Sequence, residues 1–418
     1  MSINNRLLHT PDGVRDIMPA EYVARAAVER KIEIVFESFG FTRVSSPMFE
    51  YADVFDEKGS VTQSAIYKFI DRDGSVLALR SDVTPQIARM VSTTCRPEDV
   101  PFRFSYLENA FRYNESYQGK LKEFTQAGVE LIGVDSEDAS AEVVALAVKS
   151  LLASGLHDFR IDIGQVQFFQ GILEEGGFDE SSCRYMQQSI IGRDYVAVEK
   201  AAQAANAPET VQRVLSELPL LIGGVEVLTA ARGMTANEKA LSALSNLESI
   251  YAVLCEYGVE EYIAFDLSMV GHLDYYTGII FRGYAYGTGS SVLDGGRYDN
   301  LLMHFGTDYP SVGFGIKVGV LMDALNGKAP SPHIAPDTLL VYTSEGRHAA
   351  LSAANELRAQ GLRIENCLLT DFEAYAKKHG HNGVLYFSDA DNVTLIDYIN
   401  HTERTVRISA LLSGEGVV

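Results

Sequence analysis

Apolar residues recur every three or four positions near the start of the chain, which is the spacing of an amphipathic helix. This pattern spans residues 19–39, starts with a proline and ends before Gly40, as helices commonly do. Over residues 41–49 β-forming and polar residues then alternate, and residues 76–79 follow an Asp-x-Asp-Gly turn. We therefore expect one helix followed by short strands, with Pro47 at a strand edge or an interface.

A long hairpin and a helical block are predicted in the middle of the chain. The hairpin strands are residues 102–113 and 124–133, and a polar tip joins them. A helix over 139–153 and a strand over 159–163 precede residues 165–257, which are rich in Ala, Leu, Glu and Gln and predict helices in series. Because strand-type sequence rich in Tyr and Gly returns afterwards, we interpret this block as a helical insertion. The returning strands are expected at 263–265, 278–286, 291–295 and 312–318, before a short helix that ends at Leu325.

Three prolines between Gly327 and Pro336 mark a linker, which we place at residues 327–335. The sequence then predicts a first domain over residues 1–326 and a small α/β domain over residues 336–418. Its expected elements are strands at 338–342, 363–368, 383–387 and 405–409 and helices at 346–360 and 372–378.

The chain is strongly acidic. Its 418 residues include 35 Lys and Arg against 56 Asp and Glu, which gives a formal net charge of −21. Proteins that bind nucleic acid collect phosphate contacts with basic residues, so this balance argues against DNA or RNA as a partner. The four cysteines lie far apart and outside any Cys/His cluster, which favours a reduced cytoplasmic protein without a zinc site. No stretch approaches the roughly 20 apolar residues of a membrane span, and the N-terminus lacks a signal-peptide core.

Generic cofactor motifs are absent from the sequence. There is no Gly-x-x-x-x-Gly-Lys-Ser/Thr loop, and Gly313-Phe314-Gly315 lacks the third glycine of a dinucleotide motif. The glycine-rich residues 287–296 are interpreted as tight packing between antiparallel strands. His379 and His381 have no partner at ligand spacing and are expected in an exposed turn. We therefore predict neither a cofactor nor a metal.

Three segments place polar side chains where a ligand can meet them. Asp82 and Thr84 stand two residues apart at the end of a strand-type run, so both can face one side. Gln126, Gly128 and Glu130 alternate along a predicted strand and share one face. The third segment brings aromatic and charged groups onto glycine-lined strands, and comprises Leu273-Asp274-Tyr275-Tyr276-Thr277-Gly278 and Gly295-Gly296-Arg297-Tyr298-Asp299.

In this order around the helical block, these segments resemble the catalytic domain of histidyl-tRNA synthetase, a class II aminoacyl-tRNA synthetase, from Thr10 to about residue 325. The resemblance implies an α+β fold with a central antiparallel sheet, flanking helices and a helical insertion. It also implies a dimer through the region around Pro47 and a pocket for histidine.

The resemblance further implies how the pocket holds histidine. Glu130 accepts a hydrogen bond from the imidazole N–H, and the hydroxyl of Tyr276 meets the ring, with Tyr275 in the same set. The residues implied for the ligand's backbone groups are Asp82, Thr84 and Gln126 at the α-ammonium and Arg112 at the α-carboxylate.

Groups that activate histidine with ATP are missing. Where the synthetase family has Arg-Gly the chain reads Gly271-His272, and where it has Glu-Arg in the hairpin the chain reads Asn114-Glu115. Where Gly-Leu-Glu-Arg is expected the chain reads Lys317-Val318-Gly319-Val320, so Val320 stands in place of the ATP-binding arginine. Losing one preorganised donor costs about 10²–10³ in rate, or about 3–4 kcal/mol. A pocket that keeps its amino-acid contacts without these groups is typical of a sensor.

Residues 117–133 and the Leu-Arg-x-Asp-x-Thr-Pro-Gln string at 79–86 resemble a second family more closely, the regulatory subunit of ATP phosphoribosyltransferase. That family implies a non-catalytic subunit that binds L-histidine and assembles with a short-form catalytic subunit, which condenses ATP with phosphoribosyl pyrophosphate in the first step of histidine biosynthesis. The regulatory subunit activates its partner and transmits feedback inhibition by histidine. After about residue 335 the chain is only loosely similar to an anticodon-binding domain.

Two other functions stay open at the level of the sequence. A working histidyl-tRNA synthetase would catalyse histidine-dependent pyrophosphate exchange and carry a basic tRNA-facing patch on its last domain, where this chain matches Arg and Lys with Asp and Glu. A synthetase-like protein that acts on another amino acid would be separated by a binding screen across amino acids.

Overall fold

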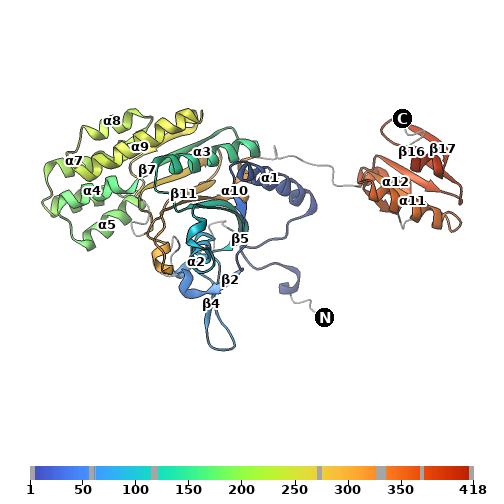
Figure 1. Ribbon diagram of the computed structural model, residues 1–418, viewed down its shortest axis with the longest axis horizontal. Helices are drawn as coiled ribbons and strands as arrows, with labels where there is room; N and C mark the ends of the chain where they lie inside the picture. Colours follow the sequence, from blue (N-terminus) through green and yellow to red (C-terminus); the bar gives the residue numbers. More distant parts are fainter. Residues whose placement is uncertain are drawn as a thin grey trace. The chain divides into compact units, whose positions relative to one another are not determined.

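The computed structural model describes residues 5–55, 61, 63–113, 121–270, 275–325, 336–367 and 371–413. The chain folds as two compact units, residues 1–330 and 331–418 (Figure 1). The predicted linker at 327–335 lies outside the described residues. Among the described residues, no helix is both long enough and apolar enough to cross a membrane.

A nine-stranded sheet lies at the centre of the first unit. Neighbouring strands are antiparallel except in the pairs β1–β5 and β7–β9, and this mainly antiparallel sheet with its helices confirms the predicted α+β fold. The order of the strands across the sheet is β1 (Thr42–Arg43), β5 (Phe102–Phe111), β6 (Glu123–Ile132), β12 (Ser311–Lys317), β11 (Leu293–Arg297), β10 (Ile279–Ala285), β7 (Phe159–Gln165), β9 (Ile263–Asp266) and β8 (Ile222–Gly223).

The predicted long hairpin is present as β5 and β6, which pair from Phe102 opposite Ile132 to Phe111 opposite Glu123. Most of its polar tip, residues 114–120, lies outside the described residues. Strand β11 begins two residues later than expected, because the residues before it complete the turn from β10.

Helices cover one face of this sheet. In α1 (Pro19–Ser38) the buried residues Val28, Ile32 and Phe36 recur every four positions and pack toward β5, β6 and α3 (Glu137–Ser154). The other helices that pack on this side are α9 (Glu238–Glu256) and α10 (Val318–Ala324).

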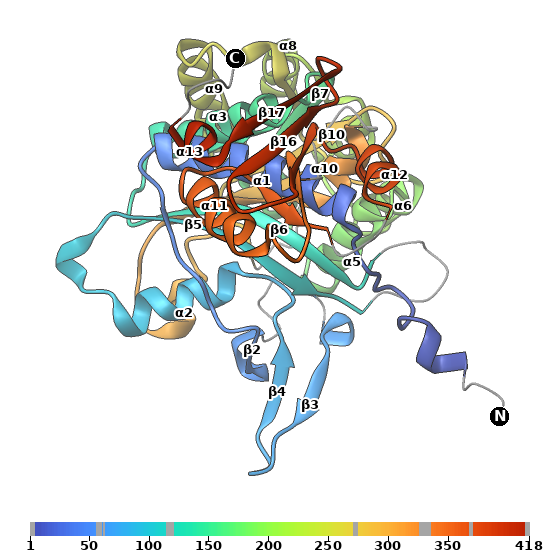
Figure 2. The ribbon, with the colours of Figure 1, turned by 90° about the vertical axis from the view of Figure 1, so that its right-hand side faces the viewer.

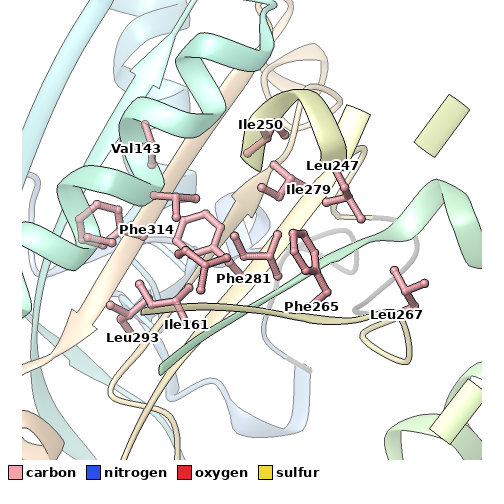
Figure 3. Close-up of a cluster of buried hydrophobic side chains, with 14 of the residues drawn as sticks. Val143, Ile161, Leu247, Ile250, Phe265, Leu267, Ile279, Phe281, Leu293 and Phe314 are labelled. Carbon is pink, nitrogen blue, oxygen red and sulfur yellow. The ribbon is translucent and has the colours of Figure 1, made fainter. Parts of the chain in front are cut away.

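The main core lies between the sheet and these helices. Figure 3 shows Phe281 of β10 and Phe314 of β12 at its centre, with Val143 of α3 on one side and Leu247 of α9 on the other. Both phenylalanines are at least 97% buried, and their rings meet edge to face at 6.4 Å. This core fixes the strands whose opposite face carries the site.

The opposite face of the sheet packs against α2 (Thr84–Thr94). Val83, Ile87 and Val91 are buried there beside Phe102 of β5 and Leu302, which lies in a short 3₁₀ helix. Because successive side chains on a strand alternate between faces, β6 serves both sides of the sheet. Its residues at 127, 129 and 131 join the main core, and those at 126, 128 and 130 face α2.

A small antiparallel sheet projects away from the large one (Figure 2). It consists of β2 (Phe49–Tyr51), β4 (Val76–Leu79) and β3 (Lys68–Ile70). The predicted strand over residues 41–49 is divided between the two sheets. Arg80 holds the crossing segment, since its side chain donates to the carbonyl of Ser46 at 2.9 Å and its backbone N–H to that of Met48 at 3.0 Å.

The predicted series of helices follows β7 and forms one side of the first unit (Figure 1). A short strand, β8, interrupts the series and pairs with β9, which the sequence pattern did not indicate. The helices before α9 are α4 (Val166–Gly176), α5 (Glu180–Ile191), α6 (Tyr195–Ala204), α7 (Glu209–Glu217) and α8 (Glu226–Arg232).

The second unit is a five-stranded sheet with helices, as the small α/β domain predicts. Its strands, in spatial order, are β14 (Ile364–Asn366), β13 (Thr338–Tyr342), β15 (Gly383–Phe387), β16 (Asn392–Asp397) and β17 (Thr402–Arg407). Its helices are α11 (Arg347–Ala359), α12 (Phe372–His379) and α13 (Ile408–Ser413).

Two predictions in this unit are wrong. The strand expected at 405–409 starts earlier, because it forms a hairpin with the unpredicted strand β16, and α13 begins at Ile408. The exposed turn expected at 379–381 is wrong for His381, whose side chain is fully buried. Its Nε2 lies 3.0 Å from Oε2 of Glu365, a partner supplied by a neighbouring part of the fold.

Candidate functional site

One cavity of about 210 Å³ lies on the α2 side of the nine-stranded sheet. All seven residues predicted to bind a ligand line it. They are Asp82, Thr84, Arg112, Gln126, Glu130, Tyr275 and Tyr276.

The floor of the cavity depends on glycines in β12. Gly313 lies opposite Glu130, and Gly315 lies opposite Gly128. The long side chains of β6 therefore extend over positions of β12 that carry no side chain. A Cβ at Gly313 would lie 1.8 Å from Oε2 of Glu130, and one at Gly315 would lie 2.1 Å from Nε2 of Gln126. The glycines therefore leave the room into which Glu130 and Gln126 extend.

Glu130 is the buried acid at one end of the cavity, with 1% of its surface exposed. The hydroxyl of Thr84 donates to Oε1 at 2.6 Å, and the hydroxyl of Tyr298 donates to Oε2. Burial raises the pKa of Glu130 to about 8, although both hydroxyl groups act in the opposite direction. The carboxyl is therefore mainly protonated at neutral pH.

Several tyrosines of the described chain stand beside Glu130. Tyr275 and Tyr276 contact each other edge to face at 4.8 Å, and Tyr275 stacks on Tyr298 at 5.7 Å. Burial raises the pKa of Tyr276 well above its ordinary value, so its hydroxyl stays neutral and can both donate and accept. Tyr298 was not among the predicted residues, although its Gly-Gly-Arg-Tyr-Asp string was singled out.

The other end of the cavity is charged. Nη2 of Arg112 lies 3.8 Å from Oδ2 of Asp82, and Nε donates to the carbonyl of Ser81 at 2.8 Å. The guanidinium also lies 5.2 Å from the ring centre of Phe124, a favourable cation–π distance. The amide oxygen of Gln126 is buried and has no hydrogen-bond partner among the described residues. Asp82 and Gln126 thus offer acceptors, and Arg112 offers donors.

Sequence reasoning also missed three charged residues of the lining, Arg282, Asp294 and Lys317. Nζ of Lys317 lies 2.5 Å from Oδ2 of Asp294, and Nε of Arg282 lies 3.5 Å from Oδ1. Burial alone would raise the pKa of Asp294, but the neighbouring Lys317 and Arg282 outweigh it and lower the pKa. The signal in the sequence was Lys317 itself, which stands where the synthetase pattern has glycine.

The other positions at which the chain departs from the synthetase pattern lie outside the cavity or outside the described residues. Val320 lies on α10 and packs partly buried against the main core rather than in the cavity. The departures at Gly271-His272 and at Asn114-Glu115 lie outside the described residues. Within the described part of the chain, no cluster of three or more His, Cys, Asp or Glu side chains has metal-binding geometry.

Comparison with known proteins first defines the class. Residues 13–321 match the family model for histidyl-tRNA synthetase. The fold is also that of the crystal structure of histidyl-tRNA synthetase from a Nostoc species, with a TM-score of 0.79 at 22% identity over 97% of this chain and 98% of the other. The fold is therefore that of a histidyl-tRNA synthetase-like protein of class II.

Closer relatives define the family within that class. ATP phosphoribosyltransferase regulatory subunits from Acetivibrio thermocellus and Ruminiclostridium cellulolyticum are 39% and 36% identical to the chain, over 97% and 98% of it and 98% and 99% of their own lengths. A crystal structure from Bacillus halodurans, described as an ATP phosphoribosyltransferase regulatory subunit/histidyl-tRNA synthetase, has a TM-score of 0.83 at 30% identity, covering 91% of this chain and 98% of that one. The chain belongs to the family of ATP phosphoribosyltransferase regulatory subunits.

Proposed function

We propose that this protein is a non-catalytic regulatory subunit that binds L-histidine in the cavity and controls a short-form ATP phosphoribosyltransferase catalytic subunit. The observation that carries the proposal is the shape of one cavity with a buried acid, Glu130, at one end and an Asp82–Arg112 pair at the other. Drug-sized ligands occupy pockets of about 300–1,000 Å³. The cavity of about 210 Å³ suits a single amino acid.

The Glu130 end matches an imidazole. Between the ordinary imidazole pKa of about 6.5 and the Glu130 pKa of about 8, the free carboxyl carries its proton and the free ring is neutral. The two groups then share one proton, which is what a hydrogen bond between them requires. Tyr276 lies beside the same position, and its neutral hydroxyl can serve either ring nitrogen.

The charged end matches the backbone groups of an amino acid. Asp82 and the unpartnered amide oxygen of Gln126 are acceptors for the α-ammonium, and Arg112 is a donor for the α-carboxylate. Thr84 donates to Glu130, so we assign it to the imidazole end as well as to the ammonium side. Gln126 is held by β6 and Thr84 by the first turn of α2, while Asp82 and Arg112 lie just outside α2 and β5.

The absence of catalysis by the chain alone is part of the proposal. A triphosphate needs cations that are free to meet it, and Val320 replaces the expected ATP-binding arginine. Relatives along nearly the whole length of the chain are named regulatory subunits. These facts favour regulation over a working histidyl-tRNA synthetase.

Self-association through the region around Pro47 is also proposed. Next to this region, Phe49 and Tyr51 on β2 and Phe69 on β3 expose between 41% and 59% of their surfaces. Apolar side chains gathered on one small sheet favour contact with another protein surface. Light scattering should therefore give twice the mass of one chain.

Isothermal titration calorimetry tests the histidine site. At pH about 7.2, L-histidine should bind one site per chain, and L-histidinol, which lacks the carboxylate, should bind at least about tenfold more weakly, or by about 1.4 kcal/mol. Gln126→Leu should weaken histidine binding, because it removes an acceptor from the ammonium while keeping the side chain's size. Gln203→Leu, at an exposed position of α6 outside this cavity, is the control. Equal binding of histidine and histidinol would contradict the assigned orientation.

A further inference from the structure

The ion pair between Asp294 and Lys317 lines the cavity beside the amino-acid contacts. Lys317 ends β12 opposite Gln126, while Gly313, four residues earlier, lies opposite Glu130. At about 3.4 Å per residue, these two positions are roughly 13 Å apart along the strand. Asp294 lies opposite Gly315, between these two positions, so the ion pair lines the half of the cavity that ends at Gln126.

This ion pair is anchored on several sides. Nζ of Lys317 donates to Oγ of Ser291 at 2.8 Å, and that hydroxyl donates to Asp294 at 2.9 Å. Arg282 approaches the other carboxylate oxygen at 3.5 Å. A long side chain held by two partners fills space that a glycine at the same position would leave open.

The pairing of charges in the cavity also disfavours a phosphate group. Among the described residues, three cationic side chains line it, Arg112, Arg282 and Lys317, and each faces a carboxylate within 4 Å, either Asp82 or Asp294. A phosphate group entering here would have to displace a carboxylate from its cation and would meet the negative charge of Asp294. A free amino acid carries no phosphate group and therefore need not displace the pair.

We propose that the Asp294–Lys317 ion pair is a specificity determinant that restricts the cavity to free amino acids and excludes nucleotides and amino acids extended at the carboxylate, such as aminoacyl adenylates. The proposal rests on the proposed function for the identity of the amino acid. The exclusion of nucleotides itself rests only on the geometry of the ion pair.

The test compares the full-length protein with the double variant Asp294→Ala/Lys317→Gly. The probes are L-histidine, a non-hydrolysable histidyl-sulfamoyl adenosine, and ATP with magnesium, each titrated by calorimetry. The wild-type protein should bind histidine but neither nucleotide probe. The double variant should gain at least about tenfold in affinity for the sulfamoyl adenosine, while its affinity for histidine changes less than about threefold. Lys317→Arg keeps the ion pair and should behave as the wild type.

Three results would overturn the proposal: tighter binding of the sulfamoyl adenosine than of histidine by the wild-type protein, binding of ATP by the wild-type protein, or no gain for either probe in a folded double variant. Thermal unfolding of each variant establishes that it is folded. If the double variant does not fold, Lys317→Gly alone should still gain affinity, and its failure to do so would count against the ion pair. If histidine binds none of the proteins, the proposed function fails, whereas a gain in ATP binding by the variant would still support the ion pair's role.

Discussion

At the scale of single residues, the central feature is the buried acid of the cavity. Glu130 accepts hydrogen bonds from Thr84 and Tyr298, yet its burial dominates and raises its pKa to about 8. Burial at that position favours the protonated, uncharged form of the carboxyl and so suits a neutral group on a ligand. A residue kept in such an environment is a candidate for ligand binding rather than for stability.

Glu130 should reduce the stability of the fold at neutral pH. Its folded-state pKa of about 8 lies above the unfolded value of 4.5, so above pH 4.5 the unfolded chain releases a proton that the folded chain keeps. Stability is lost as pH rises from about 4.5 to 8, and the loss at pH 7 is about 3 kcal/mol. Glu130→Gln should therefore be more stable than the wild type at pH 7, with a smaller difference at pH 4.5.

Chemical denaturation at several pH values measures this effect. Glu123→Gln is the matched control, because Glu123 lies at the other end of the same strand and is partly exposed. A difference between Glu130→Gln and the wild type that stays constant from pH 4.5 to 8 would contradict the raised pKa.

At the scale of elements, β6 and β12 together make the cavity. The alternation along β6 was readable from the sequence, because the polar residues at 126 and 130 lie two positions on either side of Gly128 and therefore share one face. The partners of Glu130 were not, since Thr84 and Tyr298 are 46 and 168 residues away in the chain. The burial of His381 escaped for a similar reason, because its partner Glu365 lies 16 residues away on β14.

Gly313→Ala should disrupt histidine binding. The added methyl group would lie 1.8 Å from Oε2 of Glu130 and 2.4 Å from the backbone oxygen of Val129, so the acid must move. We expect at least about a tenfold loss of affinity, or 1.4 kcal/mol, and a loss of stability of about 1–3 kcal/mol.

Gly319→Ala is the control on the neighbouring helix α10. Among the described residues, no atom outside its own helix lies within 4 Å of its added methyl group, and alanine favours a helix over glycine by about 1 kcal/mol. This variant should bind histidine like the wild type and should not lose stability. Calorimetry and thermal unfolding check both variants, and unchanged binding by Gly313→Ala would contradict the assigned cavity.

At the scale of the whole molecule, all residues that line the cavity lie in the first unit. The net charge of −21 argued at the outset against a nucleic-acid partner, and the cavity adds a local reason, because the cations among its described residues already face carboxylates. The first unit could be predicted well because its motifs resemble a known family over most of its length. The second unit could not be predicted as well, because its hairpin partners carry no such motifs.

The measurement that tests the central claim most directly is an activity assay of a short-form ATP phosphoribosyltransferase catalytic subunit, with and without this protein, across a histidine titration. We predict that the wild-type protein stimulates the catalytic subunit and that histidine inhibits the complex. The Gly313→Ala variant should still stimulate the catalytic subunit, but inhibition of its complex should need at least about tenfold more histidine. No stimulation by the wild-type protein, or equal inhibition of both complexes by histidine, would contradict the account.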